Sequence, residues 1–361
     1  MPEFLQASIQ VLLGIGLLFG GGELFVQGSV AMAVIFGIPQ LVIGLTVVSL
    51  GTSAPELFVS LSSVLQGADA LAVSNVVGCN IFNVLVVLGS SDLVLPLRVE
   101  SRLVRRDVPL MIAISAAVWG MASAGRVTWQ AGLALLLGLV INTIWEIRTA
   151  REQPDDSGSA EPDIEEDAAS GGWTLAIVRL IAGIGILTIG SRVLVSGATA
   201  AATYLGVSEA VIGLTIVSAG TSMPELITSL VAALRGRTDL AIGNVVGSCL
   251  LNLLLVLGAG ALAAAGRGLD VSPELIQDDL PVMLLTSLAC MPIFWTRGRI
   301  SRLEGGLLLG LYILYIVDNV LPRTTLASWS DEFRLLMLCF VLPVVMIVIM
   351  TQALVFWRTK A

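Results

Sequence analysis

The chain contains no histidine, few charged residues and only four cysteines, and each shortage excludes a class of protein. Charged residues make up 13% of the 361, against about 25% in an average soluble domain. Without histidine, neither a Ser-His catalytic pair nor an HExxH zinc site can form. All four cysteines lie in apolar segments and offer no disulfide framework and no CxxC metal site. Since 56% of the residues are hydrophobic, we expect a polytopic membrane protein.

Eleven apolar runs of about 20 residues are long enough to cross a bilayer as helices. They lie near residues 4–26, 40–66, 70–94, 104–124, 127–147, 174–200, 209–234, 239–264, 279–296, 303–321 and 335–357. No basic segment and no small-residue cleavage site accompany the first run, so we expect a first transmembrane helix rather than a removed signal.

An internal repeat organises these runs. Residues 41–89 recur as residues 210–258 at a constant offset of 169, with 28 identities in 49 positions and no gap. Five spans, an odd number, separate equivalent helices, so the two copies are inverted in the membrane. Inverted repeats with interrupted helices at their interface are typical of secondary transporters. The expected fold is an all-α polytopic membrane protein with two inverted-topology repeats of five transmembrane helices, broken helices at the midplane, and one extra C-terminal helix.

The chain divides at a polar segment between the copies. We expect a first repeat (1–148), an acidic linker (149–173), a second repeat (174–321) and an additional C-terminal transmembrane helix (322–361). The linker holds eight acidic residues and one arginine, a composition that favours a solvated, disordered chain; a tethered cation reservoir is the alternative. Alternate loops hold thirteen and four Lys and Arg residues. The positive-inside rule therefore predicts an outer N-terminus and a cytoplasmic linker and C-terminus, in the plasma (inner) membrane.

The repeated motif reads GTSAPE from Gly51 and GTSMPE from Gly220. Pro55 and Pro224 lack amide hydrogens, so the carbonyls four residues back, on Gly51 and Gly220, lose their helical donors. An unpaired carbonyl inside a bilayer is costly unless something satisfies it, and a bound metal cation would do so.

Oxygen-bearing side chains surround each proline. The motif itself supplies Thr52, Ser53, Glu56, Thr221, Ser222 and Glu225. The next helix of each copy, SNVVGCNIFN and GNVVGSCLLN, adds the amide oxygens of Asn83 and Asn252. An ionisable residue within a span indicates a functional site. Two glutamates that face each other would be neutralised by one divalent cation, and such an oxygen set suits Ca²⁺ or Na⁺.

The same residues also have structural interpretations. The glutamates can be buried, protonated acids, and the hydroxyls can bond to their own helices. Asn75 and Asn244 can form interhelical hydrogen bonds equally well. Glu23 and Arg192 are equivalent at the offset of 169, and we expect them to anchor the helices at the membrane interface rather than to take part in transport.

The two motifs, each followed by NVVG and by an Asn 27 residues past the Glu, resemble the two α-repeats of the Na⁺/Ca²⁺ exchanger family, within the calcium/cation antiporter superfamily. The resemblance covers the ten-helix plan of a prokaryotic calcium/sodium antiporter, but not the linker or the eleventh span. It implies alternating-access exchange of Na⁺ for Ca²⁺ around four polar corners, Glu56, Asn83, Glu225 and Asn252. It also implies flanking Na⁺ sites completed by Thr52, Ser53, Thr221, Ser222 and Ser248.

The resemblance further implies a transporter that is not an enzyme and has no cofactor. Its partners would be the transported Ca²⁺ and Na⁺ ions and the lipid bilayer, with no nucleic acid; the sequence leaves the oligomeric state undetermined.

Three residues depart from the family pattern. Cys79 stands where Ser is common, and a soft thiol is a poor Na⁺ ligand, so one flanking site and the stoichiometry are affected. Cys249 stands where Asn is usual, and we expect both cysteines to be small buried residues beside the site. Asn252 stands where many relatives have Asp, so potassium co-transport is not expected.

Three other functions remain as alternatives at this stage. The glutamates can carry protons, which would make the protein an H⁺/Ca²⁺ or other divalent-cation antiporter. A passive divalent channel is less compatible with inverted repeats around a single site, because channels are usually rings of like subunits. An intramembrane enzyme is not expected without histidine or a mid-span aspartate pair.

Overall fold

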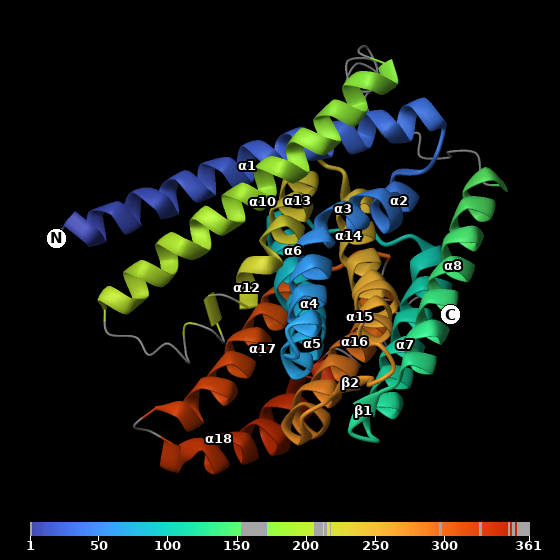
Figure 1. Cartoon of the computed structure of the whole chain (residues 1–361). Coiled ribbons are helices and arrows are strands. Elements are labelled where there is room, and N and C mark those ends of the chain that lie inside the picture. The colour runs from blue at the N-terminus through green and yellow to red at the C-terminus, as the bar shows by residue number, and fades with distance from the viewer. Residues whose placement is uncertain are drawn as a thin grey trace.

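The computed structural model describes residues 2–152, 172–205, 212, 215–216, 218–295, 298–324, 327–345, 347–348 and 351. Helices run obliquely through one bundle, with the long α1 and α10 crossing over it (Figure 1). The elements of the first half are α1 (Pro2–Phe36), α2 (Gln40–Ile43), η1 (Gly44–Val48), α3 (Ser49–Thr52), α4 (Ala54–Leu65), α5 (Asp69–Phe82), η2 (Asn83–Leu88), α6 (Gly89–Val94), η3 (Leu103–Asp107), α7 (Val108–Ala122), β1 (Arg126–Val127) and α8 (Trp129–Glu152).

The second half has a similar order of helices. Its elements are α10 (Gly172–Tyr204), α12 (Ser218–Thr221), α13 (Met223–Leu234), α14 (Thr238–Leu251), η5 (Asn252–Val256), α15 (Leu257–Ala263), β2 (Leu269–Asp270), η6 (Leu275–Asp279), α16 (Leu280–Trp295), α17 (Arg302–Val320), η7 (Leu321–Arg323), η8 (Ala327–Trp329), α18 (Ser330–Leu336) and η9 (Met337–Val341). Its strand β2 precedes η6 and α16, whereas β1 follows α7.

Most of the expected spans correspond to helices. In the described part of the chain, seven helices are long and apolar enough to cross a membrane, and one bent pair raises the number to eight. The expected span 104–124 corresponds to η3 and α7. Two expected spans, 209–234 and 335–357, lie partly outside the described residues. Most of the linker 149–173 also lies outside them.

Both repeated motifs interrupt a helix. The chain bends by 44° between Gln40–Thr52 and Ala54–Leu65, around Ser53. Ser53 (φ −82°, ψ 4°) and Ser222 (φ −90°, ψ 10°) leave the helical conformation in the same way. Pro55 and Pro224 each fall in the first turn of the helix that follows, where a missing amide hydrogen costs little. The predicted broken helices are therefore confirmed.

A contact between equivalent residues is consistent with two copies related by an axis. Two copies related by an axis can bring equivalent residues together only beside that axis. Asn80 and Cys249, 169 residues apart, meet there, with the Asn80 amide nitrogen 3.3 Å from the Cys249 carbonyl oxygen. Short backbone pairings also close the two ends of the bundle, β1 with β2 at one end and Arg98 with Arg299 at the other.

The long helices α1 and α10 pack against each other through glycines at seven-residue spacing. These are Gly14, Gly21, Gly28, Gly183, Gly190 and Gly197. A Cβ atom at Gly14 would lie 2.6 Å from the backbone nitrogen of Leu194, and one at Gly183 would lie 2.7 Å from that of Phe25. A 35-residue helix is about 50 Å long, more than the bilayer core, so α1 has to tilt strongly.

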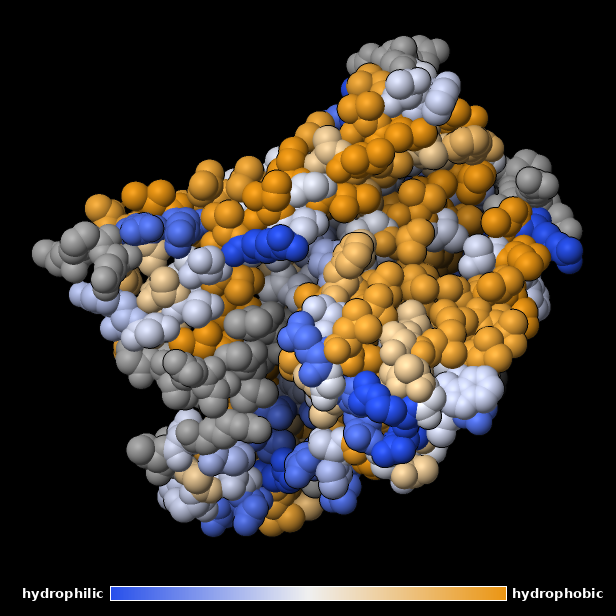
Figure 2. Space-filling view, viewed as in Figure 1, coloured by the Kyte–Doolittle hydropathy of each residue, from blue (hydrophilic) through white to orange (hydrophobic). Residues whose placement is uncertain are grey.

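The surface is apolar where a membrane would surround it. Leu12, Ile141 and Ile181 on α1, α8 and α10 are 70%, 64% and 66% exposed. Figure 2 shows apolar side chains over the upper and right parts of this face, and hydrophilic ones at the lower end near β1, β2 and α18. Most polar residues of both breaks, in contrast, are buried, an arrangement expected of a protein that carries a polar site through lipid.

The candidate cation-binding site

Two glutamates lie at the centre of the bundle. Glu56 and Glu225 occupy the first turns of α4 and α13, and both side chains are fully buried, at 0% exposure. The positive end of each helix dipole stabilises a carboxylate in a first turn. The proline before each glutamate starts that helix, so the motif itself positions both the charge and the dipole that partly offsets it.

Hydroxyl groups connect the two halves at this point. The Ser53 hydroxyl donates to Glu225 Oε1 at 3.1 Å, and the Ser222 hydroxyl donates to Glu56 Oε1 at 3.2 Å. Each serine therefore binds the glutamate of the other repeat. These crossed hydrogen bonds bring the two carboxylates into one site.

Four buried oxygens at the centre lack a hydrogen-bond partner among the described residues. They are Glu56 Oε2, Glu225 Oε2, Asn83 Oδ1 and Asn252 Oδ1. Both asparagines are fully buried and begin η2 and η5, short π-helical turns that are frequent at functional sites. The element of each asparagine packs on the opposite glutamate's helix, η2 on α13 and η5 on α4. Buried oxygens without partners are costly, and a bound cation would satisfy them.

A second ring of ligand candidates flanks these corners. The Thr52 hydroxyl lies 3.1 Å from Asn244 Oδ1 and 3.5 Å from the Ser248 hydroxyl. At the equivalent place, Cys79 Sγ lies 3.5 Å from the Thr221 hydroxyl and 3.9 Å from Glu56 Oε1. Cys79 and Ser248 are 169 residues apart, so the thiol stands where the other half has a hydroxyl.

Two asparagines act as tethers between helices. Asn75 Nδ2 donates to the Ser60 hydroxyl at 3.1 Å, joining α5 to α4. Asn244 Nδ2 donates to the Ser229 hydroxyl at 2.9 Å, joining α14 to α13. These contacts match the interhelical interpretation, although Asn244 Oδ1 also accepts from Thr52.

The structure adds two residues that sequence reasoning missed. Asn80 Oδ1 accepts from Asn252 Nδ2 at 3.3 Å and so orients that amide. Ser191 on α10 donates to the Gly220 carbonyl, the one that Pro224 leaves without a helical donor. This carbonyl therefore already has one hydrogen-bond donor at the second break, and binding of a cation through its other lone pair stays a prediction. Asn80 lies within the quoted GCNIFN stretch, whereas no local pattern marks Ser191.

The ligand set is dominated by neutral oxygens. Within the described ranges, no group of three or more His, Cys, Asp or Glu side chains is placed to hold a metal ion. The candidate site instead combines two carboxylates with amides and hydroxyls. Such hard, flexible oxygen ligands suit Ca²⁺ and Na⁺ better than transition metals.

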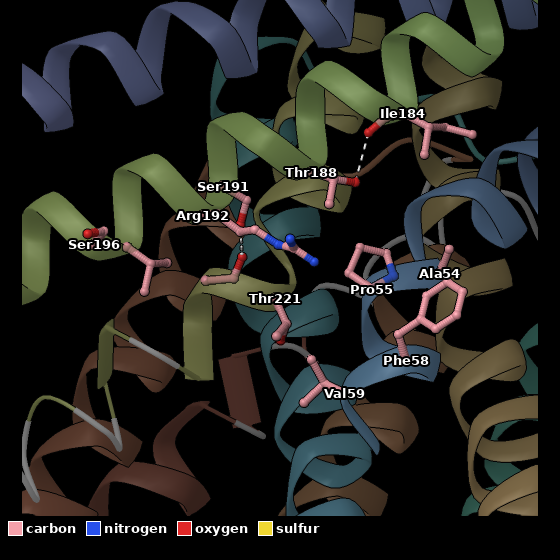
Figure 3. Close-up of a pocket in the computed structure, with 12 residues that line it drawn as sticks. Ala54, Pro55, Phe58, Val59, Ile184, Thr188, Ser191, Arg192, Ser196 and Thr221 are labelled. Atoms are coloured by element: carbon pink, nitrogen blue, oxygen red, sulfur yellow. Dashed lines mark hydrogen bonds between the residues drawn. The ribbon is translucent and has the colours of Figure 1, made fainter. Parts of the chain in front are cut away.

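A pocket reaches this region from the side of α10. Its volume is about 510 Å³, and residues of α4, α10 and α12 line it. Pro55, which precedes Glu56, and Thr221, which contacts Cys79, both belong to the wall. Figure 3 shows the Arg192 side chain extending from α10 into the same space, towards Pro55.

Comparison with known proteins agrees with this architecture. The sequence model described as "Sodium/calcium exchanger protein" matches residues 7–148 and 175–320. The chain belongs to the sodium/calcium exchanger family. The match leaves out the linker and the segment after residue 320, where Arg334 of α18 contacts Asp278 at 3.2 Å and Asp318 at 3.1 Å.

Individual relatives are similar over nearly their whole length. Inner membrane protein YrbG of Escherichia coli is 34% identical over 326 residues, 88% of this chain and 99% of that protein. Sodium/calcium exchanger MaX1 of Methanosarcina acetivorans is 29% identical over 341 residues, 85% of this chain and 96% of that protein. The solved structure of the sodium-calcium exchanger NCX_Mj, soaked with 10 mM Na⁺ and zero Ca²⁺, superposes with a TM-score of 0.72 at 30% identity, covering 87% and 98% of the two chains.

Membership in the sodium/calcium exchanger family decides the general activity. The protein is a membrane-spanning antiporter of the cation/Ca²⁺ type, and it is not an enzyme.

Proposed function

We propose that the protein exchanges Na⁺ for Ca²⁺ by alternating access. In this proposal Ca²⁺ binds at Glu56, Asn83, Glu225 and Asn252, and Na⁺ binds at flanking positions formed by Thr52, Ser53, Thr221, Ser222, Ser248 and, more weakly, Cys79. The observation that carries it is the set of four buried oxygens at the centre without hydrogen-bond partners among the described residues.

The charge of the two buried carboxylates explains why the protein would exchange ions rather than let them flow passively. Two fully buried carboxylates carry two negative charges, and leaving them uncompensated in a low-dielectric interior is costly. One Ca²⁺ or several Na⁺ ions neutralise them, and either occupant prevents the other from binding. A loaded site can therefore pass between its two accessible states far more easily than an empty one, which couples the two ions.

The coupling ion separates this proposal from a proton antiporter. Protons would neutralise Glu56 and Glu225 equally well. The relative MaX1 is named a sodium/calcium exchanger, and the hydroxyls at the crossed contacts are hard oxygen groups that suit Na⁺ and that proton binding would not need. Both observations favour Na⁺.

The proposal includes a membrane orientation and a division of the chain. The N-terminus faces outward, and the linker 149–173 and the C-terminus face the cytoplasm. Repeats 1–148 and 174–321 form the transport unit, followed by the additional C-terminal helix of 322–361. YrbG is named an inner membrane protein, which supports the same location here.

Ion flux in liposomes tests the proposed function. Purified protein is reconstituted in Na⁺-loaded liposomes, which are then diluted into Na⁺-free buffer containing Ca²⁺. We expect rapid Ca²⁺ uptake that requires internal Na⁺. In Glu56→Gln and Glu225→Gln, uptake should fall about a hundredfold, since losing one partner of a buried charge pair costs about 2–5 kcal/mol.

Glu332→Gln makes the same chemical change on the exposed surface of α18 and should leave uptake unaltered. Uptake driven by a pH gradient, without any need for Na⁺, would replace the Na⁺ proposal with the proton antiporter. Glutamine variants with normal uptake would show that the central carboxylates are not the site.

A further inference from the structure

Arg192 lies on the wall of the pocket that leads to the candidate site. The pocket joins three elements, with Pro55 on α4, Thr221 on α12 and Arg192 on α10. Its inner end is close to the ligands, because Thr221 contacts Cys79 and Pro55 directly precedes Glu56. In Figure 3 the guanidinium points across the space rather than away from it.

A cation that reaches the site through this pocket has to pass the positive charge of Arg192, an exposed side chain on the pocket wall. The repulsion is proportional to the charge of the ion, so Ca²⁺ is disfavoured twice as strongly as Na⁺ at the same position. The pocket is also lined largely by apolar side chains, including Phe58, Val59 and Ile184, which screen charge less than water does. Here a single side chain can therefore discriminate between ions of different valence.

The opposite half lacks this positive charge. The position equivalent to Arg192, at the offset of 169, is Glu23 on α1. Its carboxylate pairs with Arg235 at 2.5 Å and accepts a hydrogen bond from Gln27 at 2.7 Å. The two halves thus carry opposite formal charges at one position, and the Glu23 charge is offset by its partner. Any effect of Arg192 should therefore be confined to one face of the membrane.

We propose that Arg192 is a charge filter on one access route, lowering the apparent affinity for Ca²⁺ more than that for Na⁺ from that face. In the proposed orientation, residues 54–59 and 188–196 lie in the outer halves of their helices, so the affected face is the outer one. The inference rests on the proposed function for the nature of the ions, and it adds a residue that determines ion specificity without being a ligand. It replaces the earlier expectation that Arg192 only anchors α10 at the membrane interface.

Ca²⁺ self-exchange tests the filter without any driving gradient. Vesicles of uniform orientation are loaded with Ca²⁺, uptake of labelled Ca²⁺ is measured from each face, and external Na⁺ is added as a competitor. For Arg192→Gln we expect the KM for Ca²⁺ to fall about tenfold, from one face only. The inhibition constant of Na⁺ should fall about threefold from the same face, the square root of the Ca²⁺ factor, because Na⁺ carries half the charge. The maximal rate should stay within about twofold, because no ligand is removed.

Two variants separate charge from structure. Arg192→Lys keeps the charge and should behave as the unmodified protein. Arg179→Gln removes the same charge from the same helix away from the pocket lining, and it should change neither constant. High ionic strength should reduce the difference between Arg192→Gln and the unmodified protein.

The filter would be overturned if Arg192→Gln left the KM for Ca²⁺ and the inhibition constant of Na⁺ unchanged. It would also be overturned if both constants fell by the same factor, or if the effects were equal from both faces. Such results would identify Arg192 as an anchor, or the pocket as a space filled by lipid. These outcomes are distinct from failure of the proposed function, which would appear as the absence of Na⁺-driven uptake while Ca²⁺ self-exchange and its dependence on Arg192 persist.

Discussion

At the scale of single residues, the two halves of the site differ where Cys79 stands opposite Ser248. Thr52 and Ser248 lie 3.5 Å apart, and the equivalent Thr221 and Cys79 are also 3.5 Å apart. The geometry is thus conserved between the copies while the chemistry is not. Because sulfur is a soft, weak ligand for Na⁺, the half that contains Cys79 should bind Na⁺ less tightly.

Cys79→Ser should therefore strengthen Na⁺ binding. We expect the Na⁺ concentration for half-maximal Ca²⁺ uptake to fall about three- to tenfold, since a hydroxyl oxygen replaces the thiol at a flanking position. Titration of internal Na⁺ in the liposome assay measures this. Cys290→Ser, which alters a buried thiol bonded to its own helix at Thr286, is the matched control. If both variants keep the original Na⁺ dependence, Cys79 does not contribute to a Na⁺ site.

At the scale of elements, the close approach of α1 and α10 depends on glycine. Six glycines at matched positions let the two backbones come closer than any larger side chain permits. α10 also supplies the Ser191 hydroxyl to the second break and Arg192 to the pocket. The placement of α10 therefore decides which of its own groups reach the candidate site.

An added methyl group in this contact should destabilise the protein. In Gly183→Ala the new Cβ would lie 2.7 Å from the Phe25 backbone, and we expect a loss of roughly 1–3 kcal/mol, seen as a lower Tm in detergent. Gly185→Ala on the same helix places its Cβ where nothing lies within 4 Å and should leave the Tm unchanged or slightly raised. Equal Tm values for the two variants would show that the helices separate readily at this point.

At the scale of the whole molecule, the arrangement of charge predicts the orientation. Buried polar groups gather around the two breaks, and apolar side chains cover the long helices. Thirteen Lys and Arg residues on one side against four on the other break the symmetry of the inverted repeats. The two halves share a fold, so we expect this imbalance, and not the fold, to set the direction of insertion.

Labelling from one side of the membrane tests the orientation. Cys79, Cys249 and Cys290 are buried and Cys339 is exposed, so Cys339→Ser provides an unreactive background. In that background, an impermeant maleimide added to intact cells should label Ala124→Cys, in the exposed turn before β1. Ser157→Cys, in the acidic segment, should react only after the membrane is opened. The opposite pattern would invert the proposed topology.

The sequence alone determined the repeat, the two helix breaks and the residues around them. These features are local: Pro55 removes its own amide donor, and Glu56 follows it at once, whatever surrounds them. Comparison of the two copies then distinguished the shared motif from the apolar residues that differ between them. The expected corners Asn83 and Asn252 are fully buried on the helices that pack against the glutamates' helices.

Only the tertiary structure decided which groups meet across the two copies. Three features depend on contacts between distant segments: Ser53 binds Glu225, Ser191 donates to the Gly220 carbonyl, and Arg192 faces the access pocket. Local pattern carries no information on these pairings, because a hydrogen bond or a charge effect depends on a separation in space of a few ångströms. The packing of the two breaks on each other sets the first of these separations, and the packing of α10 on the breaks sets the other two.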